Sequence, residues 1–279
     1  MIGQIQVQEQ LHKMIAAEAF PRFIILAGLP GSGKRILITE VLCPALLTVG
    51  VSSYFVPDVK VDTVRRVEQD IYQLTNTIFI FPTADGMSTA AQNALLKMAE
   101  EVPNNNYLLL PIHDIGSVLP TIRSRGTLFT MAPYSHAELL DYCKSQGFVT
   151  KADRLSAFCQ TPGEINLLAN RIEEFDAFVQ KVFDNVHKVS GVNAFKIGNS
   201  LNISAQSADY KWNLDLFFRG FLEQCSKAIL QSRELPYDCA MRITLKYLRE
   251  LNVPAVNKQM VFNGWLLDIR KEWLPYAEC

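Results

Sequence analysis

Residues 23–35 read Phe23-Ile-Ile-Leu-Ala-Gly-Leu-Pro-Gly-Ser-Gly-Lys-Arg35, an apolar run followed by a glycine-rich loop. The run, residues 23–27, has the length and composition of a strand that is buried on both faces of a parallel sheet. The loop fits the pattern G-x-x-x-x-G-K, and the apolar residues 36–47 behind it predict a helix. Strand, loop and helix in this order are what a phosphate-binding loop requires.

The residue types of the loop suit a phosphate group. Glycines let backbone N–H groups converge on phosphate oxygens, the helix that follows adds a partial positive charge, and Lys34 adds a full one. The alternative is a glycine-rich turn between strand and helix that carries a solvated lysine. The candidate cofactor-binding residues are Gly28, Gly31, Ser32, Gly33, Lys34 and Arg35.

Two features of the sequence argue against catalysis at this loop. The pattern has Ser or Thr after the lysine, because that hydroxyl ligates Mg²⁺, and here Arg35 stands in its place. The second expected strand, Thr77–Phe81, should end in Asp-Glu, but Pro82-Thr-Ala-Asp85 follows it, and Asp85 is predicted to cap a turn. We therefore expect no efficient ATP hydrolysis and no metal ligand here, with ATP or ADP bound weakly or not at all.

Helical and strand-like patterns alternate along the first 132 residues, which predicts an α/β domain with a parallel sheet and crossover helices. After Pro133 the patterns are helical, and residues 190–209 are richer in Ser, Asn and Gly, as at a linker or a helix boundary. We expect an α/β domain that carries the phosphate-binding loop (1–132), a small helical domain (133–189) and a C-terminal all-helical domain (190–279). Further helices are expected at 4–19, 61–75, 88–101, 135–146, 151–160 and 162–170, and further strands at 107–110 and 126–131.

Composition excludes several classes of protein. The 27 Lys and Arg residues are balanced by 28 Asp and Glu residues, so the chain as a whole is not the strongly basic kind that coats naked nucleic acid. The six cysteines form no C-x-x-C pair and the four histidines are scattered, so no zinc site is expected. Because the sequence shows no signal peptide and no apolar run of about 18–20 residues, we expect a cytoplasmic protein with no membrane contact.

Several segments together resemble one family. Residues 82–103, Pro-Thr-Ala-Asp-Gly-Met-Ser-Thr-Ala-Ala-Gln-Asn-Ala-Leu-Leu-Lys-Met-Ala-Glu-Glu-Val-Pro, resemble the clamp-loader segment DEADxMTxxAxNALLKxLEEPP. Leu119-Pro-Thr-Ile-Arg-Ser-Arg-Gly126 resembles LLPTIRSRC of that family, and Val59-Lys-Val-Asp-Thr-Val-Arg-Arg-Val67 resembles IKVDxVRxV. Ile2-Gly-Gln4 and Phe20-Pro21 resemble its opening segments. The chain is similar to the delta-prime subunits of bacterial DNA polymerase III clamp loaders, within the AAA+ ATPases. The resemblance implies that residues 1–132 form an AAA+ P-loop domain, residues 133–189 a small helical lid domain and residues 190–279 a helical collar domain.

The resemblance implies a role for Ser124 and Arg125. They fall on the family's Ser-Arg-Cys motif, whose arginine reaches the ATP site of the adjacent subunit and stabilises charge that develops during phosphoryl transfer. Without the resemblance, Arg123 and Arg125 read as solvated residues before an edge strand. The implied partners are gamma/tau-like and delta-like loader subunits, a sliding clamp and primed DNA, with which the chain would act in DNA replication.

Other features of the family are missing. Only Cys43 remains where many delta-prime chains carry a four-cysteine zinc module, so the resemblance predicts no zinc here. The family's polar sensor at the end of a strand would fall near Pro111 or Ile112, and its sensor arginine would fall within residues 162–166, which contain no arginine. The groups that read the γ-phosphate in cis are therefore reduced to Lys34.

Three functions stay open at this point. The first is a non-hydrolysing clamp-loader subunit that donates Arg125 to a neighbouring ATPase subunit. The second is an ATP-hydrolysing AAA+ loader subunit with an unconventional magnesium site built from Thr39 or Asp85. The third is another P-loop protein, such as a small-molecule kinase, which would need a substrate lid that the sequence does not show.

Overall fold

The computed structural model describes residues 3–186, 213–232, 235–251 and 256–277. Contacts divide the chain into two compact units. The first contains Met1–Ser156 and Gln160–Asn166, and the second contains Ala157–Cys159 and Leu167–Cys279. The three-part division expected at residues 132 and 189 is finer than this and stays a prediction. The segment expected to be a linker, residues 190–209, lies outside the described residues.

The first unit is built on a five-stranded parallel sheet with the strand order β2-β3-β4-β1-β5. The central strand β1 is buried along its whole length, as its unbroken apolar run predicts. It pairs with β4 on one side and with β5 on the other. The strands are β1 (Phe23–Ala27), β2 (Ser52–Phe55), β3 (Thr77–Ile80), β4 (Tyr107–Ile112) and β5 (Thr127–Thr130).

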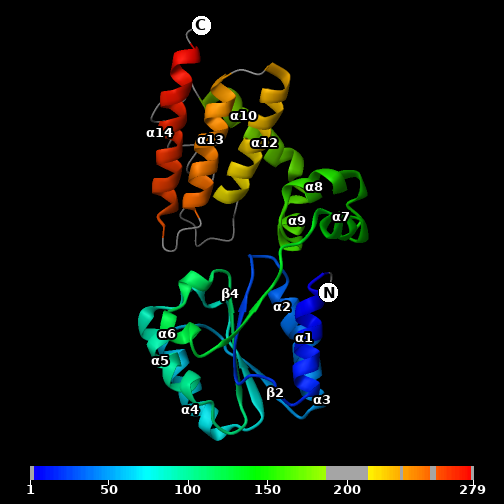
Figure 1. Cartoon of the computed structure of the whole chain (residues 1–279), viewed down its shortest axis with the longest axis vertical. Coiled ribbons are helices and arrows are strands. Elements are labelled where there is room, and N and C mark those ends of the chain that lie inside the picture. Colours follow the sequence, from blue (N-terminus) through cyan, green and yellow to red (C-terminus); the bar gives the residue numbers. More distant parts are fainter. Residues whose placement is uncertain (1–2, 187–212, 233–234, 252–255, 278–279) are drawn as a thin grey trace. The chain divides into compact units, whose positions relative to one another are not determined.

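Helices cover both faces of this sheet (Figure 1). Ile25 of β1 packs with α4 and α5 on one face, while Ile24 and Leu26 pack with α1, η1 and α3 on the other. Successive residues of a strand point to opposite faces, so both faces of β1 need an apolar cover. The helices are α1 (Ile5–Ala16), α2 (Lys34–Ile36), the π-helical η1 (Leu37–Leu42), α3 (Cys43–Thr48), α4 (Val61–Gln73), α5 (Thr89–Glu100) and α6 (Pro120–Arg123).

Most elements of the first unit lie where the sequence predicts them. Ser88 caps α5 by accepting a hydrogen bond from the N–H of Ala91, as expected. The helix expected over residues 36–47 is present, but it is π-helical until just before Pro44. Proline has no N–H, so it cannot continue the regular i→i−4 hydrogen bonds of an α-helix. Three short 3₁₀ turns connect elements: η2 (Ala84–Gly86), η3 (Ile115–Ser117) and η4 (Val149–Lys151).

Strand β2 was not predicted from the sequence. Its residues Ser52–Phe55 lie at the edge of the sheet and are mostly exposed, so they carry no apolar run. Strand β4 is two residues longer than predicted, because Pro111 is tolerated inside it opposite Leu26 of β1.

Three short helices follow the sheet: α7 (His136–Ser145), α8 (Ala152–Phe158) and α9 (Pro162–Leu168). Ser135 and Glu138 form a capping box that starts α7. All three helices were expected at these places. The first turn of α9 belongs to the same compact unit as the sheet.

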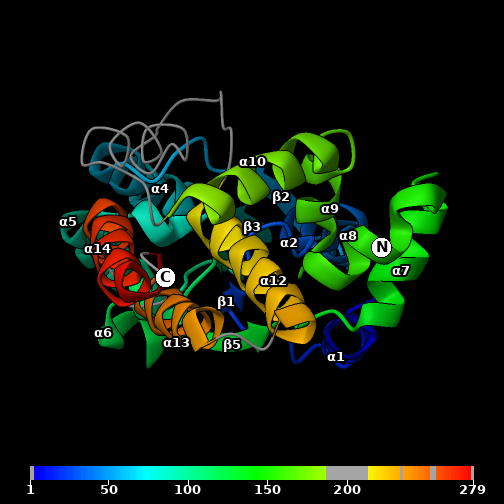
Figure 2. The ribbon, with the colours of Figure 1, turned by 90° about the horizontal axis from the view of Figure 1, so that it is seen from above.

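The second unit is helical in the part that the structure describes. Its long helices are α10 (Ile172–Asn185), α12 (Leu214–Ser232), α13 (Leu235–Glu250) and α14 (Lys258–Ala277), and α13 lies between α12 and α14 (Figures 1 and 2). Trp265 of α14 is fully buried against Phe217 and Phe221 of α12, in edge-to-face contacts. Its ring N–H donates to the buried Thr244 hydroxyl at 2.9 Å, so the polar atom of this core is satisfied.

Candidate phosphate-binding loop and surface arginine

The glycine-rich loop leaves β1 at Gly28 and enters α2 at Lys34. Gly31 and Gly33 have positive φ angles of 75° and 91°, a backbone conformation that glycine adopts without steric cost. The sequence prediction of strand, loop and helix is therefore correct at this place.

The ammonium group of Lys34 is turned back onto its own loop. Nζ donates to the carbonyl of Gly28 at 2.6 Å and to that of Leu29 at 3.0 Å, and the residue is 7% exposed. Burial lowers the pKa of Lys34 from 10.5 to about 8, although the carboxylate of Asp85 opposes the shift. The positive charge expected to face a phosphate is engaged by backbone oxygens of the loop.

Residues at the start of α9 bind Pro30 and Gly31, which form the crest of the loop. The hydroxyl of Thr161 donates to the carbonyl of Pro30 at 3.1 Å, and the N–H of Gly163 donates to the carbonyl of Gly31 at 3.0 Å. A Cβ on Gly163 would stand 2.5 Å from the Cα of Gly31, so the two backbones approach closely only because both residues are glycines. This glycine contact was not predicted from the sequence.

Tyr134 fixes the next carbonyl of the loop. Its hydroxyl donates to the carbonyl of Ser32 at 2.8 Å, so consecutive carbonyls from Gly28 to Ser32 each accept a hydrogen bond. Ser32 itself is buried, and its hydroxyl points to the sulfur of Met131 at 3.5 Å. The loop is held by the elements around it rather than left as a free solvated turn.

A cavity of about 350 Å³ lies beside the loop. It brings together five of the six predicted cofactor-binding residues, while Gly28 does not line it. No carboxylate lines this cavity, so it offers no acidic ligand to a metal ion. It is lined by Gly31, Ser32, Gly33, Lys34, Arg35, Ile36, Thr83, His113, Tyr134, Tyr142, Pro162, Gly163 and Asn166.

Asp85 is engaged by the loop that follows β4. Its carboxylate accepts hydrogen bonds from the N–H groups of His113 and Asp114 at 2.9 and 3.0 Å, and from the Ser117 hydroxyl at 3.1 Å. The ring nitrogen Nδ1 of His113 lies 3.0 Å from Oδ2. Burial alone would raise the pKa of the Asp85 carboxyl, but the bonds from His113 and Asp114 outweigh it and hold that pKa well below its usual range. Asp85 therefore fixes the turn that follows β4, whereas the sequence predicted that it caps a helix or turn of its own segment.

His113 is the polar residue at the end of β4, and the sequence pattern does not reveal it. The apolar run predicts a strand that ends at Leu110, with the strand-end position near Pro111 or Ile112, but the strand runs to Ile112. His113 follows directly and lines the cavity beside the loop. The run of apolar residues before it was the available signal, and Pro111 obscured it.

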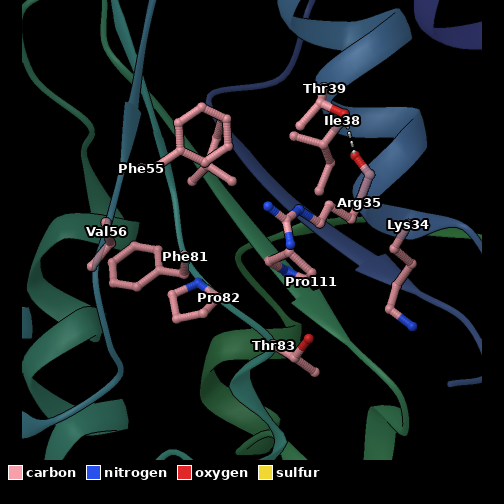
Figure 3. A pocket seen from close by; sticks show the side chains of 11 residues that line it. Lys34, Arg35, Ile38, Thr39, Phe55, Val56, Phe81, Pro82, Thr83 and Pro111 are labelled. Atoms are coloured by element: carbon pink, nitrogen blue, oxygen red, sulfur yellow. Dashed lines mark hydrogen bonds between the residues drawn. The ribbon is translucent and has the colours of Figure 1, made fainter. Parts of the chain in front are cut away.

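Arg35 and Thr39 leave the loop on the first turns of its helix. The hydroxyl of Thr39 donates to the carbonyl of Arg35 at 3.0 Å, one turn back along the same helix. The side chain of Arg35 lines a second cavity, next to Pro111 (Figure 3). Arg35 thus stands at the sequence position where the pattern has a metal-binding hydroxyl, and its guanidinium points into this second cavity.

The predicted finger, Arg125, lies at the surface just after α6. Its guanidinium donates to Oε1 of Glu100 at 2.6 Å and to the carbonyl of Thr121 at 2.8 Å, and 34% of the side chain is exposed. The hydroxyl of Ser124 also donates to the carbonyl of Thr121, at 3.0 Å. Ser124 thus finishes the helix, whereas Arg125 presents a held, partly exposed cation.

Residues 56–135 match the family model described as DNA polymerase III, delta subunit. The chain is similar to DNA polymerase III delta-prime subunits. It is 31% identical over 121 residues to the delta-prime subunit of Haemophilus influenzae. The aligned segment covers 42% of this chain and 37% of the relative. The resemblance expected from the sequence motifs is confirmed, and the matched range contains Arg125.

Two further relatives extend the comparison. The delta-prime subunit of Yersinia pestis is 38% identical over 69 residues, 23% of this chain and 20% of the relative. Replication factor C subunit 4 of Schizosaccharomyces pombe is 23% identical over 218 residues, 71% of this chain and 60% of the relative. This chain thus spans less than two thirds of the length of each of the three relatives.

Solved structures support the fold. One structure of a RuvB variant from Thermotoga maritima matches with a TM-score of 0.51 at 16% identity, over 99% of this chain and 88% of that chain. A second RuvB mutant from the same organism gives the same TM-score of 0.51 at 18% identity, over 96% of this chain and 88% of that chain. The expected fold, an α/β domain with a parallel sheet followed by a mostly helical region, is confirmed.

The described residues contain neither a group of potential metal ligands nor a membrane-spanning helix. Within the described ranges, no three His, Cys, Asp or Glu residues are grouped so that they could hold a metal ion. None of the helices in the same ranges is long and apolar enough to cross a membrane.

Proposed function

We propose that this chain is a clamp-loader subunit in DNA replication that does not hydrolyse ATP itself. It donates Arg125 to the ATP site of a neighbouring subunit. The observation that carries the proposal is a contrast within one domain. The segment that resembles delta-prime subunits contains a partly exposed Arg125, while the chain's own loop has Arg35 in the metal-ligand position and no carboxylate in its cavity.

Hydrolysis in cis needs a metal ion and a residue that orients the attacking water. The two residues that an unconventional magnesium site would use are both engaged. Thr39 donates its hydroxyl to the helix backbone, and Asp85 is bound by His113 and the N–H groups around it. The alternative of an ATP-hydrolysing subunit therefore rests on Lys34 alone, whose ammonium is bound to the loop.

A subunit that assists hydrolysis at its partner's site needs to supply only a cation that reaches the γ-phosphate, because the partner provides the metal ion and the attacking water. A guanidinium is planar, always charged and able to bind two phosphate oxygens at once, so one exposed arginine suffices. Arg125 meets this requirement after it exchanges Glu100 for the phosphate. The proposed partners are gamma/tau-like and delta-like subunits, a sliding clamp and primed DNA. A chain of net charge −1 suits a subunit that shares the DNA with partners.

The test is a reconstituted loader with gamma/tau-like and delta-like subunits, sliding clamp and primed DNA. Arg125→Ala should lower the ATPase rate at the site that it serves by about 10³-fold. Arg123→Ala, an exposed arginine two residues away, is the matched control and should leave the rate within about twofold. The isolated chain should hydrolyse ATP far more slowly than about 1 s⁻¹. Turnover near that value, or equal effects of the two substitutions, would contradict the proposal.

A further inference from the structure

A cavity of about 600 Å³ lies between the helix that follows the loop and the carboxyl ends of β2, β3 and β4 (Figure 3). Its walls are mostly apolar. Phe55 closes one side, Phe81 and Pro82 form another, and Pro111 and Ile38 face them. The volume falls in the range of ordinary small-molecule sites, about 300–1,000 Å³.

One cation in this cavity is unengaged. The side chain of Arg35 projects into it above Pro111 (Figure 3). In the part of the chain that the structure describes, its guanidinium makes no ion pair and no side-chain hydrogen bond. The other cation of the lining, Lys34, is bound to the carbonyls of Gly28 and Leu29. The lining contains no carboxylate, and its remaining polar groups are the hydroxyls of Thr39 and Thr83.

This combination selects a particular ligand chemistry. A guanidinium binds a carboxylate through two parallel hydrogen bonds, and Arg35 is exposed, so that a carboxylate can reach it from solvent. Aromatic and aliphatic walls bind an apolar body by removing its surface from water. A metal cation finds no acidic ligand here, and a bare phosphate ion leaves the apolar walls uncovered.

We propose that the cavity is a binding site for a small hydrophobic carboxylate. The carboxylate pairs with Arg35, and an aromatic or branched aliphatic body packs against Phe55, Phe81 and Pro111. The cavity shares Lys34, Arg35 and Thr83 with the cavity beside the loop, but none of the loop residues 28–33 lines it. The inference does not depend on the clamp-loader proposal, because the ligand and its pocket belong to one chain.

The direct test is a titration of the whole chain with 2-naphthoate, followed by NMR of isoleucine methyl groups. The methyl signals of Ile38 and Ile80, which line the cavity, should shift in a saturable way with a dissociation constant below about 1 mM. The signal of Ile172, in the other compact unit, should stay in place. The uncharged amide of the same acid should bind about tenfold or more weakly, and inorganic phosphate should leave these signals unmoved.

Single substitutions test how much the charge of Arg35 and the aromatic ring of Phe55 contribute to the binding of 2-naphthoate. Arg35→Gln should weaken 2-naphthoate binding by about tenfold or more. Arg65→Gln removes the same charge from the exposed face of α4 and should not change the affinity for 2-naphthoate. Phe55→Ala should weaken it several-fold, and this substitution leaves the core intact because Phe55 is 56% exposed.

Three results would overturn the inference. One is the absence of any saturable shift at Ile38 and Ile80. Another is that 2-naphthoate and its amide bind with equal affinity, or that Arg35→Gln binds 2-naphthoate as tightly as the parent chain does. The third is displacement of 2-naphthoate by ATP with the same methyl shifts, which would assign the cavity to a nucleotide.

Discussion

The N–H of Gly163 donates to the carbonyl of Gly31 at 3.0 Å, and this bond joins the first turn of α9 to the crest of the glycine loop. Neither residue leaves room for a side chain. A Cβ on Gly163 would meet the Cα of Gly31 at 2.5 Å and its carbonyl oxygen at 3.1 Å. The loop that resembles a nucleotide site is therefore held by a neighbouring helix through a contact between two backbones.

Gly163→Ala should destabilise the chain by about 1–3 kcal/mol, because the methyl group must push the loop and α9 apart. Urea unfolding of the full chain measures this change. Gly86→Ala is the matched control, since a Cβ there meets nothing within 4 Å, and it should stay within about 0.5 kcal/mol. Equal stability of the two variants would mean that the contact between Gly31 and Gly163 is not maintained in solution.

Lys34→Met should destabilise the chain at pH 7 by about 1–3 kcal/mol, because the buried carbonyl of Gly28 loses the Lys34 donor and that of Leu29 keeps only the N–H of Ser32. The difference from the parent chain should also depend on pH. Burial lowers the pKa of Lys34 from 10.5 to about 8, so the unfolded chain binds more protons between these values. The stability of the parent relative to Lys34→Met should therefore rise from pH 8 to pH 10.5. A difference that stays flat or falls over this range would contradict the burial of the ammonium.

Asp85→Asn should destabilise the chain at pH 7 by about 1–3 kcal/mol, because the amide replaces a carboxylate that accepts bonds from His113, Asp114 and Ser117. The folded chain holds the pKa of the carboxyl below its usual value of about 3.9. Its contribution is complete above that value and is lost as pH falls through the lower folded pKa. Unfolding measured at pH 7 and at pH 3 should show the gap between parent and variant shrinking at the lower pH.

Arg125→Ala should change the free energy of unfolding by less than about 1 kcal/mol, because its pairing with Glu100 is largely solvated. A loss of partner ATPase in this variant then reports function rather than misfolding. Arg219→Ala is the contrasting case. Arg219 is 11% exposed and donates to both Asp215 and the carbonyl of Phe158, so its removal should destabilise the chain more, by about 1–3 kcal/mol. Thermal unfolding of both variants makes the comparison. The reverse order would argue that Arg125 is structural.

Much of the first domain follows from local pattern. Buried strands of a parallel sheet are continuous apolar runs, so β1 and β3 were placed correctly. The edge strand β2 and the far end of β4 were not. Residues Ser52–Phe55 pair through backbone groups, without an apolar pattern, and Pro111 is accepted because neighbouring strands hold it.

The order of residues alone specifies which chemical groups are present at the loop. The glycines, Lys34, the arginine in the place of a metal-binding hydroxyl, and the missing acidic pair after β3 can all be read along the chain. The hydrogen-bond partners of these groups follow from the packing of the folded chain. Thr161 contacts Pro30 across 131 residues, and the partner of Asp85 lies 28 residues away in another loop. Such contacts depend on how helices and strands pack in space, and spacing along the chain does not encode them directly.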